Sequence, residues 1–200
     1  MEYQQYNLTG FLTTSNKEII DISKAWLAIS IAFGLVLGGI TITFFRSFII
    51  SMITVGLGFL LHELSHKVVA QYYHYKAEFR SFDKMLFLAV IISFFGFVLA
   101  APGAVIIQTH ENNIKKSGHI SMAGPLMNII LASIFFVLSL FIHHGGIIKD
   151  IISYGFLINS WLALFNMIPF SLFDGAKIFK WNKIIWGLFT VMCVMFVFIL

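Results

Sequence analysis

Charged residues are scarce in this sequence. They make up 11% of the 200 residues, whereas about 25% is typical of soluble domains. Hydrophobic residues make up 59%, and the mean hydropathy is +0.91. This composition excludes a soluble globular domain and indicates an integral membrane protein surrounded by a lipid bilayer. The net charge of +4 is small and spread over several loops, which argues against a nucleic-acid-binding surface.

Cysteine, proline and polar linkers are scarce as well. The single cysteine, Cys193, excludes an intrachain disulfide, and we interpret it as a small residue within an apolar run. The three prolines fall within or at the edge of apolar runs, so no Pro-rich linker separates two domains. We expect one membrane domain over 1–200, with its core at 47–175 and a polar N-terminal segment at 1–24. No secretory signal is expected, because that segment has acidic residues and no continuous apolar core.

Long apolar runs fill most of the chain, and a spanning helix needs about 20 such residues. Runs without a charged residue cover 25–45, 85–107, 120–142 and 151–173. Two further candidates are 47–72, which is interrupted only by a polar stretch, and the shorter run 184–200. We predict an all-α integral membrane protein with five to six transmembrane helices. A capping box at Ser15 and Glu18 should start the helix that leads into the first span.

The run at 85–107 can either cross the membrane or dip into it and return. Short loops rich in Lys and Arg stay in the cytoplasm. If the run does not cross and the N-terminus is inside, 11 Lys and Arg residues lie inside and 2 lie outside. If the run crosses, 7 of these residues lie inside and 6 lie outside. We therefore favour a re-entrant segment between the second and third spanning helices, turning at 101–104, with an ordinary sixth span as the alternative. In the favoured topology, helices 47–72 and 151–173 both end in the cytoplasmic half of the membrane.

Residues 62–66, His-Glu-Leu-Ser-His, match the His-Glu-x-x-His pattern. Positions i and i+4 lie on one face of a helix, so His62 and His66 can bind one Zn²⁺ while Glu63 points at a water molecule. A charge at the bilayer centre costs about 3 kcal/mol, and a metal ion in a water-filled cavity would offset that cost. The alternative is a set of polar residues that pack helices together near a cytoplasmic helix end.

A catalytic zinc ion takes three protein ligands and keeps a fourth position for water. Asp174 is the best candidate for the third ligand. Pro169 should interrupt the helix about one turn before it, and Gly175 permits unusual backbone angles that would turn the carboxylate toward the metal. In the favoured topology Asp174 lies on the same side of the membrane as His66. The alternative is an Asp that merely begins a cytoplasmic loop.

These residues resemble the motifs of the site-2 protease family of intramembrane zinc metalloproteases. Residues 62–66 match its first motif, and 166–175, Asn-Met-Ile-Pro-Phe-Ser-Leu-Phe-Asp-Gly, match its second, with Phe173 where the family usually has Leu. Residues 123–128, Ala-Gly-Pro-Leu-Met-Asn, resemble the Gly-Pro-x-x-Asn start of the helix between them. Together the motifs span about 62–175 on consecutive hydrophobic helices, and their order makes the combination specific.

The resemblance implies a substrate that is a transmembrane helix of another protein, cut within or near the membrane plane. It also implies a β-rich, membrane-dipping element after the first motif, in agreement with the charge distribution. We expect none of the PDZ or CBS domains that some members carry, and the sequence leaves the oligomeric state open.

Asn128 and Asn166 are candidate substrate-binding residues. A buried amide in lipid must find hydrogen-bond partners, and an unwound substrate offers unpaired backbone groups. Helix packing is the alternative reading. It applies above all to Asn128, which shares a small-residue face with Ser121, Gly124 and Ala132.

The predicted reaction is metal-assisted peptide hydrolysis with one zinc ion held by His62, His66 and Asp174. Glu63 would take a proton from the attacking water as general base and return it to the leaving amine. The substrate helix must unwind first, and a strand from 76–118 could hold the unwound peptide by β-addition. Two rival functions are a catalytically silent relative that binds transmembrane clients and a metal transporter. The complete set of four residues argues against the first, and the convergence of the ligands on one site argues against the second.

Overall fold

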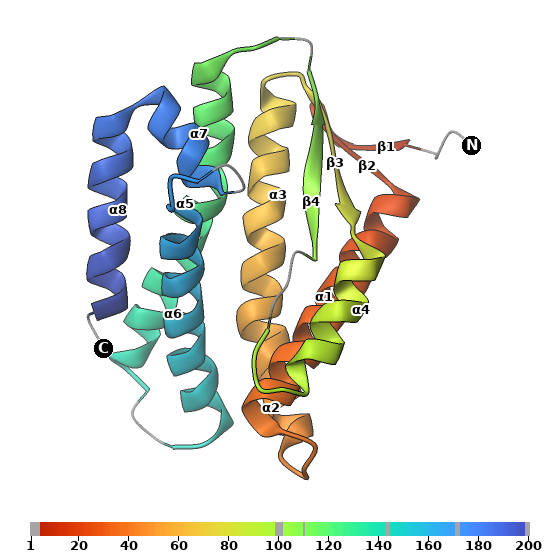
Figure 1. Cartoon of the computed structure of the whole chain (residues 1–200), viewed down its shortest axis with the longest axis vertical. Coiled ribbons are helices and arrows are strands. Elements are labelled where there is room, and N and C mark those ends of the chain that lie inside the picture. Colours follow the sequence, from red (N-terminus) through yellow and green to blue (C-terminus); the bar gives the residue numbers. More distant parts are fainter. Residues whose placement is uncertain (1–4, 99–101, 110, 143–144, 171–172, 199–200) are drawn as a thin grey trace.

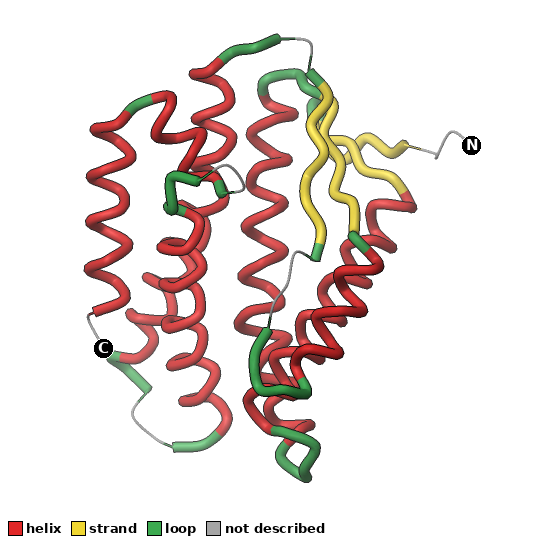
Figure 2. Tube along the Cα trace, in the orientation of Figure 1, coloured by secondary structure: helices red, strands yellow, loops and turns green. Residues whose placement is uncertain are grey.

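A computed structural model describes residues 5–98, 102–109, 111–142, 145–170 and 173–198. The described part is mostly helical, and its short strands gather on one side of the molecule (Figures 1 and 2). In chain order the elements are β1 (Gln5–Thr9), β2 (Leu12–Ser15), α1 (Asn16–Gly38), α2 (Phe44–Ser51), the π-helix η1 (Met52–Gly56), α3 (Leu57–Tyr72), β3 (Lys76–Ser81), α4 (Asp83–Ser93), β4 (Gly103–Gln108), α5 (Ile114–Ser139), α6 (Ile147–Asn166), α7 (Asp174–Trp181) and α8 (Lys183–Phe198).

Four helices within the described residues are long and apolar enough to cross a membrane. They are α1, the continuous helix made of α2, η1 and α3, then α5 and α6. α8 has 16 residues, fewer than the roughly 20 that a crossing needs. Four of the predicted spans meet this length criterion within the described residues, and α8 is the candidate for a fifth.

The N-terminal segment is more structured than its polar sequence suggests. β1 and β2 pair antiparallel, and α1 begins at Asn16, well before the apolar run that starts at residue 25. Ser15 is the N-cap, since its Oγ accepts a hydrogen bond from the N–H of Glu18 at 3.2 Å. The Glu18 carboxylate does not complete the predicted capping box; it is fully buried and binds Lys67 and the N–H of Phe79.

The run at 85–107 forms a short helix and a strand. α4 has 11 residues, which extend about 16 Å at 1.5 Å per residue, roughly half of the hydrocarbon core. The chain turns after α4, where Gly96 has a φ of +88°. The turn predicted at 101–104 is wrong for its last two residues, which belong to β4, while its first residue lies outside the described part.

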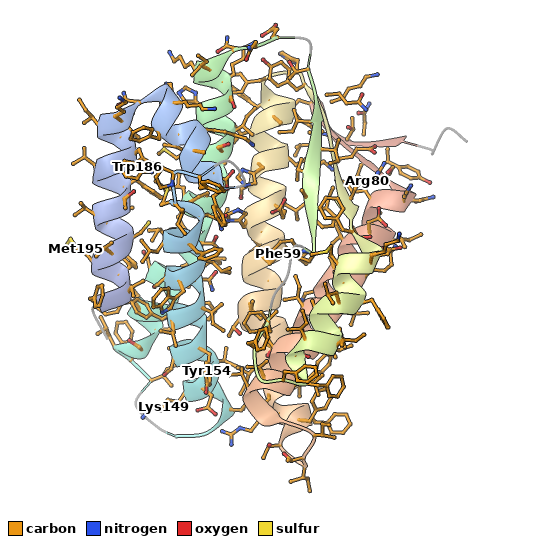
Figure 3. All side chains as sticks on the ribbon, viewed as in Figure 1. Phe59, Arg80, Lys149, Tyr154, Trp186 and Met195 are labelled. Atoms are coloured by element: carbon orange, nitrogen blue, oxygen red, sulfur yellow. The ribbon has the colours of Figure 1, made fainter. Side chains whose placement is uncertain are left out.

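β3 and β4 form an antiparallel hairpin in which Phe79 lies opposite Val105. Ala77 and Phe79 are 2% and 0% exposed, whereas Ile106 is 46% exposed, so one face of the hairpin is buried and the other is open. Phe59 lies between α3 and the sheet and meets Phe79 edge to face, with ring centroids 6.1 Å apart (Figure 3). The β-rich element that the resemblance implies after the first motif is therefore present as strands.

α3 lies in the middle of the molecule (Figure 1). The hairpin, α1 and α4 lie on one side of it, and α5 to α8 lie on the other. The second group has its own apolar core, formed by Ile129, Ala163, Met167, Ile178, Phe189 and Cys193. This arrangement places the His-Glu-x-x-His motif of α3 between the β-hairpin and α5, deep within the protein.

Candidate metal centre

The two histidines of the motif lie one turn apart on α3. His62 and His66 are 5% and 8% exposed, and their Nε2 atoms are 3.1 Å apart. α5 passes so close to them that a Cβ on Gly124 would lie 2.5 Å from each Nε2 atom. Glycine is needed at this position because a side chain would fill the space in front of the two nitrogens.

The outer nitrogen of His62 is held by an asparagine network. His62 Nδ1 is 2.6 Å from Asn128 Oδ1. The amide of Asn128 donates through Nδ2 to Gly58 O at 3.2 Å and to Asn159 Oδ1 at 3.0 Å. Because these partners accept, the oxygen of Asn128 must face His62, and His62 Nδ1–H is the donor. The Nε2 atom of His62 therefore presents a lone pair.

His66 is oriented in the same way by the backbone. Its Nδ1 lies 2.7 Å from the carbonyl oxygen of Ile120 in α5. A carbonyl only accepts hydrogen bonds, so Nδ1–H of His66 donates and Nε2 again presents its lone pair. Such outer partners fix the ring orientation and the tautomer of histidines that bind a metal.

Asp174 reaches the histidines because the chain breaks between α6 and α7. α6 ends at Asn166, and Pro169 follows, as the sequence predicts. α7 then begins at Asp174, whose Oδ2 lies 3.3 Å from His62 Nε2 and 3.1 Å from His66 Nε2. Two segments more than a hundred residues apart thus meet at one point.

The start of α7 is packed tightly against the end of α6. A Cβ on Gly175 would collide with the carbonyl groups of Met167 and Ile168. Gly175 lies in the first turn of α7 with helical backbone, so glycine is needed for this close approach and not for the unusual angles predicted from the sequence. Trp186 of α8 supports the junction by donating its Nε1–H to Met167 O at 2.8 Å (Figure 3).

The converging atoms fit a zinc ion. Three lone-pair atoms within 3.1–3.3 Å of one another repel unless a metal ion or shared protons lie between them. In a tetrahedral zinc site with bonds of about 2.0–2.1 Å, ligand atoms lie about 3.3 Å apart. Burial alone would raise the pKa of the Asp174 carboxyl, but protons on the imidazoles of His66 and His62, which take the place of a metal's charge, outweigh burial and hold that pKa below its usual range. The donors, their spacing and the open space before Gly124 all suit a single metal ion.

Glu63 lies beside the two histidines and contacts the hairpin. Its Oε2 accepts a hydrogen bond from Val105 N–H of β4 at 3.1 Å. The ligand-capable atoms of His62, Glu63 and His66 all lie within 4.8 Å of one another. The carboxylate is therefore close enough to act on a water molecule at the metal.

Both predicted substrate-binding asparagines have hydrogen-bond partners within the protein, and their contact with substrate stays a prediction. Asn128 is fully buried, and both groups of its amide are used by His62, Gly58 and Asn159. Asn166 donates its Nδ2–H to Leu162 O of its own helix at 2.9 Å. Asn128 is therefore a support of the histidine, and Asn166 lies at the end of α6 in contact with its own backbone.

Asn128→Ala should weaken zinc affinity about 10–100-fold, the usual effect of removing the partner that orients a metal-binding histidine. Asn166→Ala is the matched control, since its amide bonds to its own helix, and it should leave the affinity unchanged. Competition with a chelating dye measures both dissociation constants. Equal zinc affinities in the two variants would argue against the support that Asn128 gives to His62.

Sequence reasoning missed the partners behind the histidines. Asn159 is fully buried within α6 and bonds to Asn128, and Val105 donates its N–H to Glu63. An uncharged but polar residue within a spanning run is costly in lipid, so Asn159 could have been singled out. The contacts that the backbone groups of Ile120 and Val105 make with the site cannot be predicted from the sequence, because any residue type supplies the same backbone groups.

Comparisons with known proteins agree with this geometry. Residues 48–152 match the model of Peptidase family M50. A protein of Methanocaldococcus jannaschii named "Putative zinc metalloprotease MJ0611" is 42% identical over 175 residues, which cover 87% of this chain and 89% of that protein. No solved structure matches the chain significantly. The chain therefore belongs to peptidase family M50, the site-2 protease family of intramembrane zinc metalloproteases.

Proposed function

We propose that this metalloprotease cuts a transmembrane segment of another membrane protein. His62, His66 and Asp174 are the proposed ligands of its one zinc ion. Glu63 is the proposed general base. The observation that supports the assignment most directly is the meeting of α3 and α7, which brings three ligand atoms within 3.1–3.3 Å of one another, with the Glu63 carboxylate close to the two histidines.

Each residue near the proposed metal site has a separate role in the proposed hydrolysis. When bound, zinc lowers the pKa of a water molecule toward about 7 and polarises the scissile carbonyl. Glu63 takes the proton of the attacking water and passes it to the amide nitrogen that leaves. Asn128 and Ile120 keep the two imidazoles in the tautomer that binds a metal, so they act through the histidines.

The outer edge of β4 is the proposed docking site for the unwound client. In an antiparallel pair, every second residue points its N–H and C=O away from its partner strand. Val105 is such a residue, because its N–H bonds to Glu63 outside the sheet. A client strand that pairs along this edge would run past Glu63 and the proposed ligands, which supports β-addition as the mode of binding.

The segment from β3 to β4 is proposed to dip into the membrane without crossing it. α4 is too short to cross, and its apolar side chains face outward: Phe87 is 69% exposed and Ile91 is 41% exposed, with Phe95 just beyond the helix at 76%. The polar start of α4 is tied to α1, since Lys24 Nζ lies 2.8 Å from Asp83 Oδ1. Lipid would cover the exposed rings, while the charged pair stays near the polar end.

The active site is proposed to lie toward the cytoplasmic side. Lys149 lies at the end of the molecule away from the β-strands (Figure 3), and Arg46 pairs with Asp150 beside it at 2.7 Å. The other 11 Lys and Arg residues belong to α1, to the stretch from α3 to α5, and to α7 and α8. The positive-inside rule then favours a cytoplasmic position for the end where α3 finishes, a short distance after His66.

Cleavage of a single-span client should depend on zinc. In vesicles that contain the purified protein and such a client, a chelator should remove essentially all cleavage, and added zinc should restore it. Gel analysis of the client measures the cut, and a zinc-sensitive dye inside the vesicles measures metal transport.

The same assay separates the rival functions. Zinc flux without cleavage would indicate a transporter, and client binding without cleavage in the zinc-loaded protein would indicate a silent relative. Either result would reject the protease assignment. A client whose transmembrane segment is replaced by polyleucine, a stable helix, controls for the need to unwind.

A further inference from the structure

α3 carries a second polar stripe beside its proposed metal ligands. Glu63, Lys67 and Gln71 follow at intervals of four residues and therefore share one face of the helix. This face meets both strands of the β-hairpin. Glu63 accepts the N–H of Val105 in β4 at 3.1 Å, and Gln71 donates its Nε2–H to Ala77 O in β3 at 2.9 Å.

Lys67, the middle residue of this stripe, reaches the hairpin through Glu18 of α1. Lys67 Nζ donates to Glu18 Oε2 at 2.6 Å, and Glu18 Oε1 accepts the N–H of Phe79 at 2.9 Å. Thr14 Oγ1 also donates to Glu18 Oε2, at 2.8 Å. Glu18 is 0% exposed and Lys67 is 5% exposed, so both charges are buried and satisfied.

The two carboxylates hold the hairpin at one residue pair. Phe79 and Val105 are direct partners in the antiparallel register. Their N–H groups point to opposite outer edges, where Glu18 accepts one and Glu63 accepts the other. A displacement of Phe79 along β3 would therefore carry Val105 away from Glu63.

We propose that Glu18, through its bonds to Lys67 and to the Phe79 N–H, is a positioning residue that sets the register of the β4 edge against Glu63 and thereby selects the client peptide bond that is cut. This inference rests on the proposed function. Buried ion pairs contribute little to stability compared with apolar residues of the same size, so a role in geometry gives this pair a reason to be present.

Register matters because a client strand takes its position from β4. Successive residues of an extended strand are about 3.3 Å apart. A shift of β4 by one residue would bring a neighbouring peptide bond in front of Glu63 and would reverse which side chains face the site. A loosely held β4 therefore predicts cleavage at several adjacent bonds, whereas a firmly held β4 predicts a single cut.

Two double variants separate the positioning role from general stability. Glu18→Leu with Lys67→Met removes both charges and the acceptor for Phe79 N–H, and Glu18→Gln with Lys67→Met removes the charges but keeps an amide oxygen as acceptor. Neither leaves an unpaired buried charge, so both should fold and bind zinc at the wild-type ratio. In the Leu variant we expect cuts at neighbouring bonds and a KM raised about tenfold or more, the scale of one lost hydrogen bond to a charged group.

Mass spectrometry of the client products measures the position of the cut. The hydrogen-exchange rate of the backbone amides of 103–108 measures how firmly β4 is held, and this measurement does not depend on activity. The Gln variant should keep the single wild-type cut, and the amide hydrogens of its β4 should exchange as slowly as those of the wild type. In the Leu variant the same amide hydrogens should exchange about ten times faster than in the wild type. Identical cleavage patterns and exchange rates in the two double variants would overturn the proposal. Failure of the wild-type protein to cut any client would instead count against the proposed function, while the exchange comparison would still decide the role of Glu18 in holding β4.

Discussion

Glu63→Gln should stop client cleavage while the protein keeps its zinc. The amide has the size of the carboxylate but cannot accept a proton from water, so the rate should fall about 10²–10⁴-fold or more, the range that general acid–base catalysis supplies. Zinc should remain because His62, His66 and Asp174 are untouched. Single-turnover cleavage in vesicles measures the rate, and elemental analysis of the purified variant measures the metal.

Asp174→Asn is the matched comparison, because it makes the same change from carboxylate to amide on the other side of the site. It should lose most of the zinc together with the activity, since the anionic oxygen 3.1–3.3 Å from both histidines disappears. The opposite pattern, with zinc lost from Glu63→Gln and kept by Asp174→Asn, would exchange the roles of the two carboxylates. Full activity in Glu63→Gln would reject its role as base.

The meeting of His62, His66 and Asp174 could be predicted because each signal is local. Two histidines four residues apart share a helix face whatever surrounds them. Pro169 ends a helix because it lacks the backbone N–H, which needs no tertiary contact. Asp174 follows shortly after it, and an acidic residue at that place in an apolar chain is a natural candidate for a metal ligand. The structure brings these residues together as predicted, while their roles in binding and catalysis stay predictions for the variants above.

The supports of the site could not be predicted, because they depend on packing between distant segments. Asn128 was expected to contact substrate, yet the approach of α3, α5 and α6 turns its amide toward His62 and Asn159. Glu18 was expected to cap α1, yet the position of β3 draws its carboxylate to Lys67 and to backbone. A local pattern names the residue type that a position needs, but tertiary packing decides which partner that residue finds.

The run at 85–107 illustrates a different limit. Its apolar composition suits a spanning helix, and the arguments against one were the charge distribution and the membrane-dipping element that the family resemblance implies. The structure divides the run because β4 pairs with β3, a contact between strands separated by a complete helix. Hydropathy alone does not distinguish an apolar strand in a hairpin from part of an apolar helix.

Gly124→Ala should remove most of the zinc while the helices stay intact. The added methyl group would lie 2.5 Å from the Nε2 atoms of both His62 and His66, in the space that a shared ion needs. α5 cannot easily retreat, because Asn128 and Ile120 on the same helix hold the outer nitrogens of those rings. We expect zinc content to fall to a small fraction of one ion per chain, with client cleavage lost in proportion. Elemental analysis and circular dichroism together measure metal and helix content.

Gly187→Ala in α8 is the control for this substitution. A Cβ at Gly187 meets nothing within 4 Å among the described residues, and alanine in a helix is favoured over glycine by roughly 1 kcal/mol. This variant should therefore bind one zinc ion and cut the client as the wild type does. If Gly124→Ala also bound zinc at the wild-type ratio, the ion could not occupy the space between the two Nε2 atoms and α5, and the assignment of His62 and His66 as its ligands would have to be abandoned.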